Sequence, residues 1–183
     1  MILRFAFVLC LSALASVLAP VAAAWAGDTP ALGWIAAKGD APVPAVALAK
    51  YSGPDDVRLP ASGVKTVVHF WATWCGPCVS ELPAMDRFST VLQAQGVAVF
   101  AVSEDKGGAA AVQTFLARAD GVKAMPQVLD PLHVFSHALG INFLPVTVLF
   151  AADGREIGRF VGSGDWDGAD RQMLLSHLTE GNP

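Results

Sequence analysis

The sequence predicts a mixed α/β fold, with a central β-sheet that has helices on both faces. Short runs of apolar, β-branched residues alternate with longer segments of helical spacing, as expected for strands joined by helices. The run at 66–71 (TVVHFW) is nearly all apolar, which indicates a strand buried on both faces. Asp153 and Gly154 separate two further apolar runs and predict a hairpin, and therefore an antiparallel end of the sheet.

The predicted elements follow one another without a linker or a repeat. After the strand at 66–71, residues 77–96 carry apolar positions three and four apart, with Pro77 in the first helical turn and Pro83 as an internal kink. A strand at 97–102 completes a unit whose crossover should be parallel and right-handed. Beyond it we expect helices at 107–119, 131–139 and 167–178, and strands at 127–129, 146–150 and 156–161.

Residues 1–26 have the pattern of a secretory signal. One basic residue, Arg4, precedes an apolar run, and the residues Ala-Trp-Ala at 24–26 fit a small-x-small cleavage site. The alternative is a retained membrane anchor, because a spanning helix needs about 20 apolar residues and this run would reach that length if Pro20 were tolerated. We expect residues 27–183 to form one exported domain, and Cys10 to be removed with the signal.

Composition argues against several classes of function. The net charge is −4, and no cluster of lysine and arginine exists that would follow a phosphate backbone, so nucleic-acid binding is not expected. No apolar run after residue 26 approaches spanning length. No cofactor-binding motif occurs, neither GxGxxG after a strand nor GxxxxGK[ST], so we expect no cofactor and a chemistry that rests on thiols alone.

Two of the three cysteines, Cys75 and Cys78, lie where the strand gives way to the helix. Thiols of exported proteins readily pair, but closing so short a loop removes little unfolded-state entropy, so a purely structural disulfide is not favoured. At the start of a helix, unsatisfied N–H groups and the helix dipole favour the thiolate. Cys75 is therefore the candidate nucleophile and the more buried Cys78 its resolving partner. Gly76 and Pro77 leave the sulfur open to a second protein.

The residues from Trp74 to Cys78 (WCGPC) resemble the active-site motif of thioredoxins. With their surroundings they are similar to the exported thiol-disulfide reductases of the TlpA/ResA type, some of which serve cytochrome c or copper-oxidase maturation. The surrounding features are FWAT at 70–73, Glu81, Pro83, NFLPVT at 142–147, DG at 153–154, Gly162, and DW at 165–166. The resemblance covers about Pro42 to the final helix and implies a thioredoxin-like fold in the bacterial periplasm.

The resemblance also implies roles outside the motif. Pro145 is expected to follow a cis peptide bond and to lie beside the cysteines, which would expose the backbone of Leu144 for strand-like pairing with a substrate. The residues alone would favour a trans proline that opens a strand. Glu81, one turn beyond Cys78, is a candidate to carry the proton that Cys78 loses, with a solvated helix residue as the alternative.

Three aromatic residues, His69, Trp71 and Trp74, lie near the motif in the sequence. His69 departs from thioredoxin, which has a buried acid there. It is either a proton carrier or a hydrogen-bonded core residue. Trp71 is expected in the core. Trp74, next to Cys75, is a candidate rim for the substrate, with packing as the alternative.

Two other functions compete with disulfide reduction. CxxC is also half of a zinc site, and His133 and His137 stand four apart on a predicted helix, so copper or zinc binding is one alternative. Both histidines are far from the cysteines in sequence, and there is no second CxxC. A disulfide oxidant or isomerase is the other alternative. Gly76 and Pro77 are the thioredoxin pair and predict a reducing potential, below about −200 mV.

The partners expected of a reductase follow from its chemistry. They are client proteins that contain disulfides, and an electron source, since a reductase in an oxidising compartment must itself be reduced again. We expect that source to be a membrane thiol transporter, and we expect the protein to be a monomer.

Overall fold

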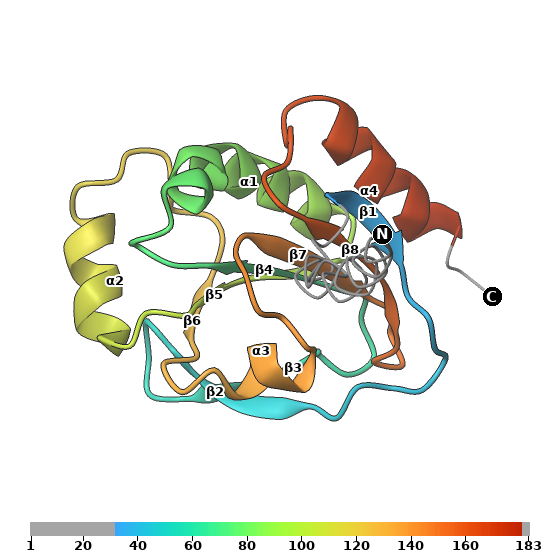
Figure 1. Ribbon diagram of the computed structural model, residues 1–183, viewed down its shortest axis with the longest axis horizontal. Helices are drawn as coiled ribbons and strands as arrows, with labels where there is room; N and C mark the ends of the chain where they lie inside the picture. Colours follow the sequence, from blue (N-terminus) through green and yellow to red (C-terminus); the bar gives the residue numbers. More distant parts are fainter. Residues whose placement is uncertain (1–31, 181–183) are drawn as a thin grey trace, which may run out of the picture. The chain divides into compact units, whose positions relative to one another are not determined.

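A central sheet of eight strands organises residues 32–180, the part of the chain that the computed structural model describes (Figure 1). The strand order is β1-β8-β7-β4-β5-β6-β2-β3. β4 runs parallel to β5 and antiparallel to β7, so the sheet is mixed, as the sequence predicts. The signal predicted at 1–26 lies outside the described residues.

The strands and helices have the following bounds. The strands are β1 (Gly33–Ala36), β2 (Val46–Lys50), β3 (Asp56–Leu59), β4 (Thr66–Trp71), β5 (Ala98–Ser103), β6 (Gln127–Leu129), β7 (Val146–Phe150) and β8 (Glu156–Val161). The helices are α1 (Gly76–Ala94), α2 (Gly108–Leu116), α3 (Val134–Ala138) and α4 (Ala169–Glu180).

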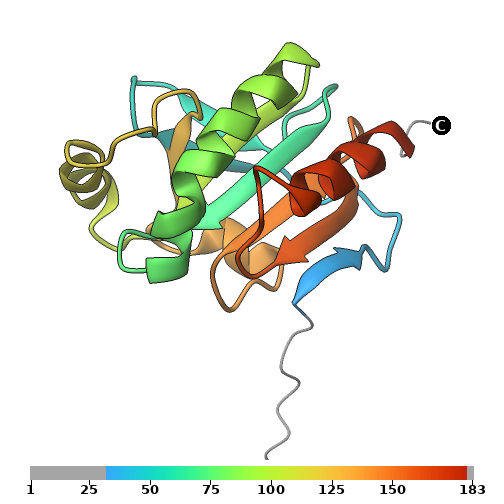
Figure 2. The ribbon, with the colours of Figure 1, turned by 90° about the horizontal axis from the view of Figure 1, so that it is seen from above.

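Helices cover both faces of the sheet, which confirms the predicted layering. Figure 1 shows α1 and α4 above the sheet and α3 below it, and Figure 2 shows α1 and α4 side by side across the upper face. The core on the side of α1 and α4 includes Leu82, Phe88 and Trp166, all fully buried or nearly so. The core on the side of α3 joins Phe135 to residues of the sheet, including Phe150. Every residue of β4 is buried between these two layers, which explains its continuous apolar run.

The structure corrects two features of the sequence interpretation. The predicted helix at 131–139 is shorter, because α3 begins only at Val134 and His133 before it has a φ of 56°. Strands β1, β2 and β3 were not predicted. They are four or five residues long and partly exposed, so their apolar signal is weak. β1 pairs with β8 at one edge of the sheet, and at the other edge β2 pairs with β6 and β3 pairs with β2.

Candidate active site

The two cysteines lie at the N-terminus of α1, as predicted, and form a disulfide. Cys75 is the N-cap residue, and its Sγ accepts a hydrogen bond from the backbone N–H of Cys78 at 3.3 Å. Cys75 is 6% exposed and Cys78 is fully buried, so the predicted order of burial is confirmed. The first turn of the helix therefore directs the N–H of Cys78 at the sulfur of Cys75, and this place at a helix N-terminus favours a thiolate when the disulfide is reduced.

The segment before Cys75 is fixed by Asp105, a residue that the sequence interpretation missed. Its carboxylate accepts hydrogen bonds from the backbone N–H of Thr73 (3.0 Å), the hydroxyl of Thr73 (2.6 Å) and the hydroxyl of Ser103 (2.8 Å). Asp105 is 3% exposed and follows β5, the parallel neighbour of β4. Because parallel strands end at the same edge of a sheet, an acid just after β5 was the available signal for this contact.

The surface around the disulfide is open on the side of the loop. Gly76 and Pro77 are exposed, and Trp74 is 69% exposed, which fits the predicted rim rather than packing in the core. Trp71 is fully buried, as predicted. Trp74, Gly76 and Pro77 therefore form exposed surface next to Cys75 in the sequence.

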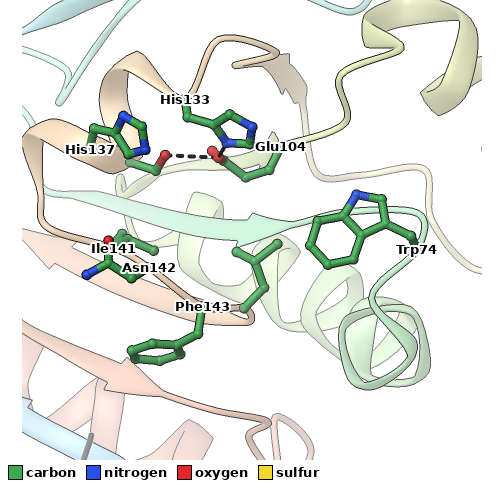
Figure 3. A pocket seen from close by; sticks show the side chains of 9 residues that line it. Trp74, Glu104, His133, His137, Ile141, Asn142 and Phe143 are labelled. Carbon is green, nitrogen blue, oxygen red and sulfur yellow. Dashed lines mark hydrogen bonds and ion pairs between the residues drawn. The ribbon is translucent and has the colours of Figure 1, made fainter. Parts of the chain in front are cut away.

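The peptide bond between Leu144 and Pro145 is cis, as the family resemblance implied. Pro145 is buried, and its carbonyl accepts a hydrogen bond from the N–H of Gly162 at 3.0 Å. Leu144 is half-buried and lines a pocket together with Trp74; Figure 3 shows this pocket with Trp74 labelled. This shared pocket brings the segment before Pro145 close to the cysteine loop, although the two are distant in sequence.

Glu81 is buried, so its interpretation as a solvated helix residue is wrong. It is 7% exposed, and its Oε2 accepts a hydrogen bond from the N–H of Gly164 at 2.7 Å. Burial raises the pKa of Glu81 to about 7, and the Gly164 N–H and the nearby indole of Trp166 only partly offset this rise in the pKa. The indole Nε1 itself has no partner of normal hydrogen-bond geometry among the described residues. A carboxyl group with such a pKa can both accept and release a proton near neutral pH.

His69 lies in the core and also faces Glu81. It is fully buried, and its Nδ1 is 2.9 Å from the hydroxyl of Thr147. Its Nε2 lies 3.7 Å from Oε1 of Glu81, and within residues 32–180 neither atom has a hydrogen-bond partner. Burial lowers the pKa of His69 to about 4, so the ring is neutral at physiological pH. The core placement considered for His69 is confirmed, and its approach to Glu81 is a contact that the sequence did not reveal.

The histidines considered as metal ligands do not complete a metal site in the described part of the chain. The rings of His133 and His137 stack with centroids 5.8 Å apart, and His133 precedes α3 instead of lying within it. Among residues 32–180, no group of three or more histidine, cysteine, aspartate and glutamate side chains is arranged to hold a metal ion.

With this geometry in view, comparison with known proteins gives the family. The Redoxin family model matches residues 37–174, and the chain belongs to this family. Sporulation thiol-disulfide oxidoreductase A of Bacillus subtilis is 48% identical over 46 residues, which are 25% of this chain and 28% of that protein. Thiol-disulfide oxidoreductase ResA of Geobacillus thermodenitrificans is 34% identical over 95 residues, 51% of this chain and 52% of that protein. The chain thus spans about half, or less, of the length of these relatives.

Solved structures agree with the fold. The Chlorobium tepidum protein described as a thiol:disulfide interchange protein DsbE superposes with a TM-score of 0.65 at 27% identity, over 75% of this chain and 95% of that one. StoA from Bacillus subtilis gives a TM-score of 0.62 at 22% identity, over 74% and 97% of the two chains. The resemblance inferred from the motif, and the thioredoxin-like fold that it implied, are therefore confirmed. Within residues 32–180, no helix is both long and apolar enough to cross a bilayer.

Proposed function

We propose that this chain is an exported thiol-disulfide oxidoreductase that reduces disulfides in client proteins. The observation that carries the proposal is the Cys75–Cys78 disulfide at the N-terminus of α1, with Cys75 as the helix cap beneath an open loop. A structural disulfide would not need a nucleophile-stabilising helix end or an exposed rim. The names of the relatives, all thiol-disulfide oxidoreductases, support the same activity.

The reaction proceeds in two exchange steps. In the reduced protein, the thiolate of Cys75 attacks one sulfur of a client disulfide, so a mixed disulfide forms and the other client sulfur leaves as a thiolate. Cys78 then loses its proton and attacks Cys75. The mixed disulfide breaks, the second client sulfur leaves, and the Cys75–Cys78 disulfide forms. Two electrons pass to the client, and a dithiol donor must return them to this protein.

Glu81 is the proposed acceptor for the proton of Cys78. It lies one helical turn beyond Cys78, and its pKa of about 7 suits a group that takes up a proton and passes it to the departing client thiolate. The proposed client-binding residues are Trp74, Gly76, Pro77, Leu144 and Pro145. The backbone of Leu144 would pair with the client segment as an added strand, since this mode of recognition depends on main-chain hydrogen bonds.

The compartment and partners belong to the same proposal. Residues 1–26 have the pattern of an export signal or a membrane anchor, which supports an exported domain, in a bacterium one that works in the periplasm. There a membrane thiol transporter would supply electrons, and clients would include proteins of cytochrome c or copper-oxidase maturation.

Trapping tests the proposed mechanism. Cys78→Ser should accumulate a mixed disulfide between Cys75 and a client, because the resolving thiol is missing. Reducing-agent-sensitive adducts, identified by mass spectrometry from a periplasmic extract, are the readout. Cys75→Ser is the matched control and should trap nothing. Equal adducts in both variants, or none in either, would refute the assignment of Cys75 as the nucleophile.

A redox titration separates the reductase from a disulfide oxidant. Equilibration with glutathione or dithiothreitol buffers should give a reduction potential of the Cys75–Cys78 pair below about −200 mV. Such a potential is reducing, like that of thioredoxin, and is expected because the dipeptide between the cysteines is Gly-Pro. A value near about −120 mV would instead assign the protein to the oxidants.

A further inference from the structure

A pocket beside the disulfide has one wall from the cysteine loop and another from the segment before the cis-proline. Its volume is about 270 Å³, and its lining includes Trp74 from the first segment and Leu144 from the second. Figure 3 shows Trp74 and Phe143, which immediately precedes Leu144, at the pocket. Trp74 immediately precedes Cys75. A polypeptide whose cysteine reaches Cys75 and whose backbone runs along Leu144 therefore carries a neighbouring side chain over this pocket, which we call the Glu104 pocket.

The polar side of the pocket is built around a buried carboxylate. The side chain of Glu104 is 4% exposed, and its Oε2 accepts a hydrogen bond from the hydroxyl of Ser136 at 2.9 Å and pairs with Nδ1 of His133. Its Oε1 has no hydrogen-bond partner among the described residues. Burial raises the pKa of Glu104, while the hydrogen bonds from His133 and Ser136 lower it. A buried carboxylate left partly unpaired is costly unless a cation or further donors approach it.

The rest of the pocket favours a cation and offers none of its own. Among the described residues that line the pocket there is no lysine or arginine, and the basic side chains are those of His133, which pairs with Glu104, and His137. The apolar walls include Trp74 and Phe143, which are 69% and 36% exposed. Aromatic faces attract the charged groups of lysine and arginine, and the apolar stems of these two side chains pack well on aromatic surfaces.

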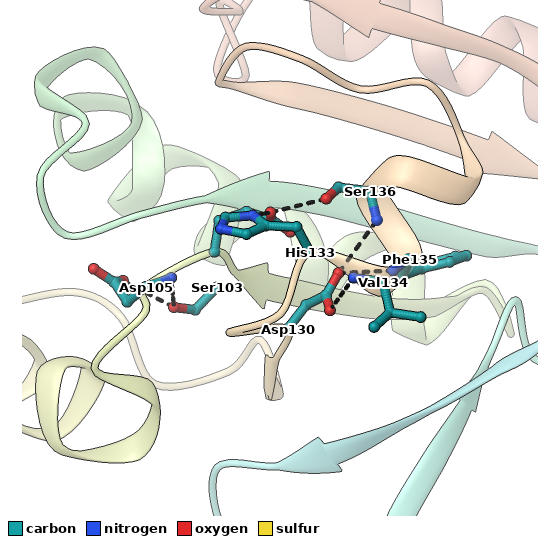
Figure 4. Close-up of polar contacts among 8 residues, drawn as sticks. Ser103, Asp105, Asp130, His133, Val134, Phe135 and Ser136 are labelled. Carbon is teal, nitrogen blue, oxygen red and sulfur yellow. Dashed lines mark hydrogen bonds and ion pairs between the residues drawn. The ribbon is translucent and has the colours of Figure 1, made fainter.

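The pocket is held in place by the cap of α3. The carboxylate of Asp130 accepts hydrogen bonds from three successive N–H groups, those of Val134 (2.7 Å), Phe135 (2.9 Å) and Ser136 (3.2 Å) (Figure 4). His133 lies at the start of this turn with a φ of 56°, the one left-handed residue other than glycine in the described chain. Such a conformation is uncommon for residues other than glycine, and His133 adopts it at the turn from which its ring contacts Glu104.

We propose that the Glu104 pocket is a specificity subsite that binds a lysine or arginine side chain next to the reactive cysteine of a client polypeptide. The cationic head lies near the carboxylate of Glu104, and the stem packs on Trp74 and Phe143. This inference rests on the proposed function, because it assumes that client cysteines react with Cys75.

Peptide disulfides test the subsite. Reduced full-length protein is mixed with short peptides, each with one cysteine that forms a mixed disulfide with glutathione. The peptides differ in one residue, which is Lys, Ala or Glu and stands either directly before or directly after that cysteine. Release of glutathione gives the rate. We expect the lysine peptide to react about tenfold faster than the glutamate peptide at one of the two positions, which corresponds to about 1.4 kcal/mol. In Glu104→Gln this lysine-to-glutamate ratio should fall at least about threefold.

The matched control is Asp120→Asn, which removes the same charge from a different groove, lined by residues of α1 and α2. The ratio should stay at its wild-type value in this variant, because only long-range attraction is changed. Should Glu104→Gln fail to fold, Phe143→Ala, at an exposed wall position, should slow the lysine peptide more than the alanine peptide.

Three results would overturn the subsite. They are equal rates for all peptides, the same lysine-to-glutamate ratio in Glu104→Gln as in Asp120→Asn, and a lysine-to-alanine rate ratio in Phe143→Ala that equals the wild-type ratio. If the wild-type protein reacted with none of the peptides, including the alanine peptide, the proposed function itself would fail and the subsite with it. Reaction without preference leaves the proposed function standing and removes only the subsite.

Discussion

At the scale of single residues, Glu81 of α1 and His69 of β4 show how burial between the helix and the sheet shifts the pKa values of two titrating groups in opposite directions. Burial opposes the charged form of each, so the pKa of the acid rises to about 7 and the pKa of the base falls to about 4. Their facing atoms lie 3.7 Å apart. At neutral pH the ring is neutral and the carboxyl group is only partly ionised, so the pair does not behave as a permanent salt bridge.

The raised pKa of Glu81 predicts a pH-dependent cost in stability. In the folded state Glu81 binds its proton more tightly than in the unfolded state, where the pKa is about 4.5. The free energy of unfolding should therefore fall as pH rises from about 4.5 to 7. The glutamine in Glu81→Gln does not titrate. Between pH 4 and pH 8 the free energy of unfolding of this variant should therefore rise, relative to that of the wild type, by about 1 to 3 kcal/mol.

Urea unfolding of both proteins across this pH range measures the effect. His69 titrates in the other direction, because its pKa is lower in the folded state, but it is present in both proteins and largely cancels in the comparison. Parallel stability curves for the two proteins would show that Glu81 keeps an ordinary pKa, and would remove the argument for it as a proton carrier.

At the scale of elements, buried carboxylates tie loops to the helices and strands that carry the site. Asp86 in α1 accepts the N–H groups of Lys123, Ala124 and Met125. Asp130 caps α3, and Asp105 holds the segment before Cys75. Each of these carboxylates replaces the hydrogen bonds that a loop would otherwise make with water, and each joins segments that no regular element connects.

Asp105→Ala should destabilise the protein by about 2 to 3 kcal/mol. The change leaves the Thr73 N–H and two hydroxyl groups without their acceptor in a region where Asp105 is 3% exposed. Asp167→Ala is the comparison, since Asp167 forms an exposed ion pair with Arg87 and should cost less than about 1 kcal/mol. Urea denaturation gives both values, and similar costs for the two variants would contradict a fixing role for Asp105.

At the scale of the whole molecule, the segment from 33 to 59 extends both edges of the sheet. β1 pairs with β8 at one edge, while β2 and β3 extend the other edge through β6. The approach of β1 depends on Gly158 in β8, because a Cβ there would lie 2.5 Å from the ring of Trp34 and 2.7 Å from the carbonyl of Ile35. Trp34 in turn stacks on His177 of α4, with ring centroids 4.1 Å apart, so β1 also connects the sheet to the last helix.

Gly158→Ala should therefore cost about 1 to 3 kcal/mol and loosen β1, because backbone must move to make room for the methyl group. Thermal unfolding measures the loss, and amide hydrogen exchange in β1 shows where it occurs. Gly39→Ala is the control, as an added Cβ there has no atom within 4 Å. Exchange in β1 as slow as in the wild type would contradict the close packing of this edge.

The sequence by itself determined the local arrangement that carries the proposed chemistry. The buried strand, the CxxC turn with Pro77 and the helix after it are each specified by neighbouring residues, so spacing and turn chemistry were enough to place Cys75 at a helix start. The hairpin across Asp153 and Gly154 was specified in the same way. The cis bond before Pro145 was predicted only through the family resemblance.

The tertiary structure alone decided which distant residues meet. Asp105 reaches Thr73 across 32 positions, and His69 faces Glu81 from a different element. Glu104 meets His133 and Ser136 in the lining of the pocket. The weak edge strands likewise form only because the sheet supplies partners for them. The physical reason is that these contacts depend on the packing of helices against a sheet, and local spacing carries no information about which side chains that packing brings together.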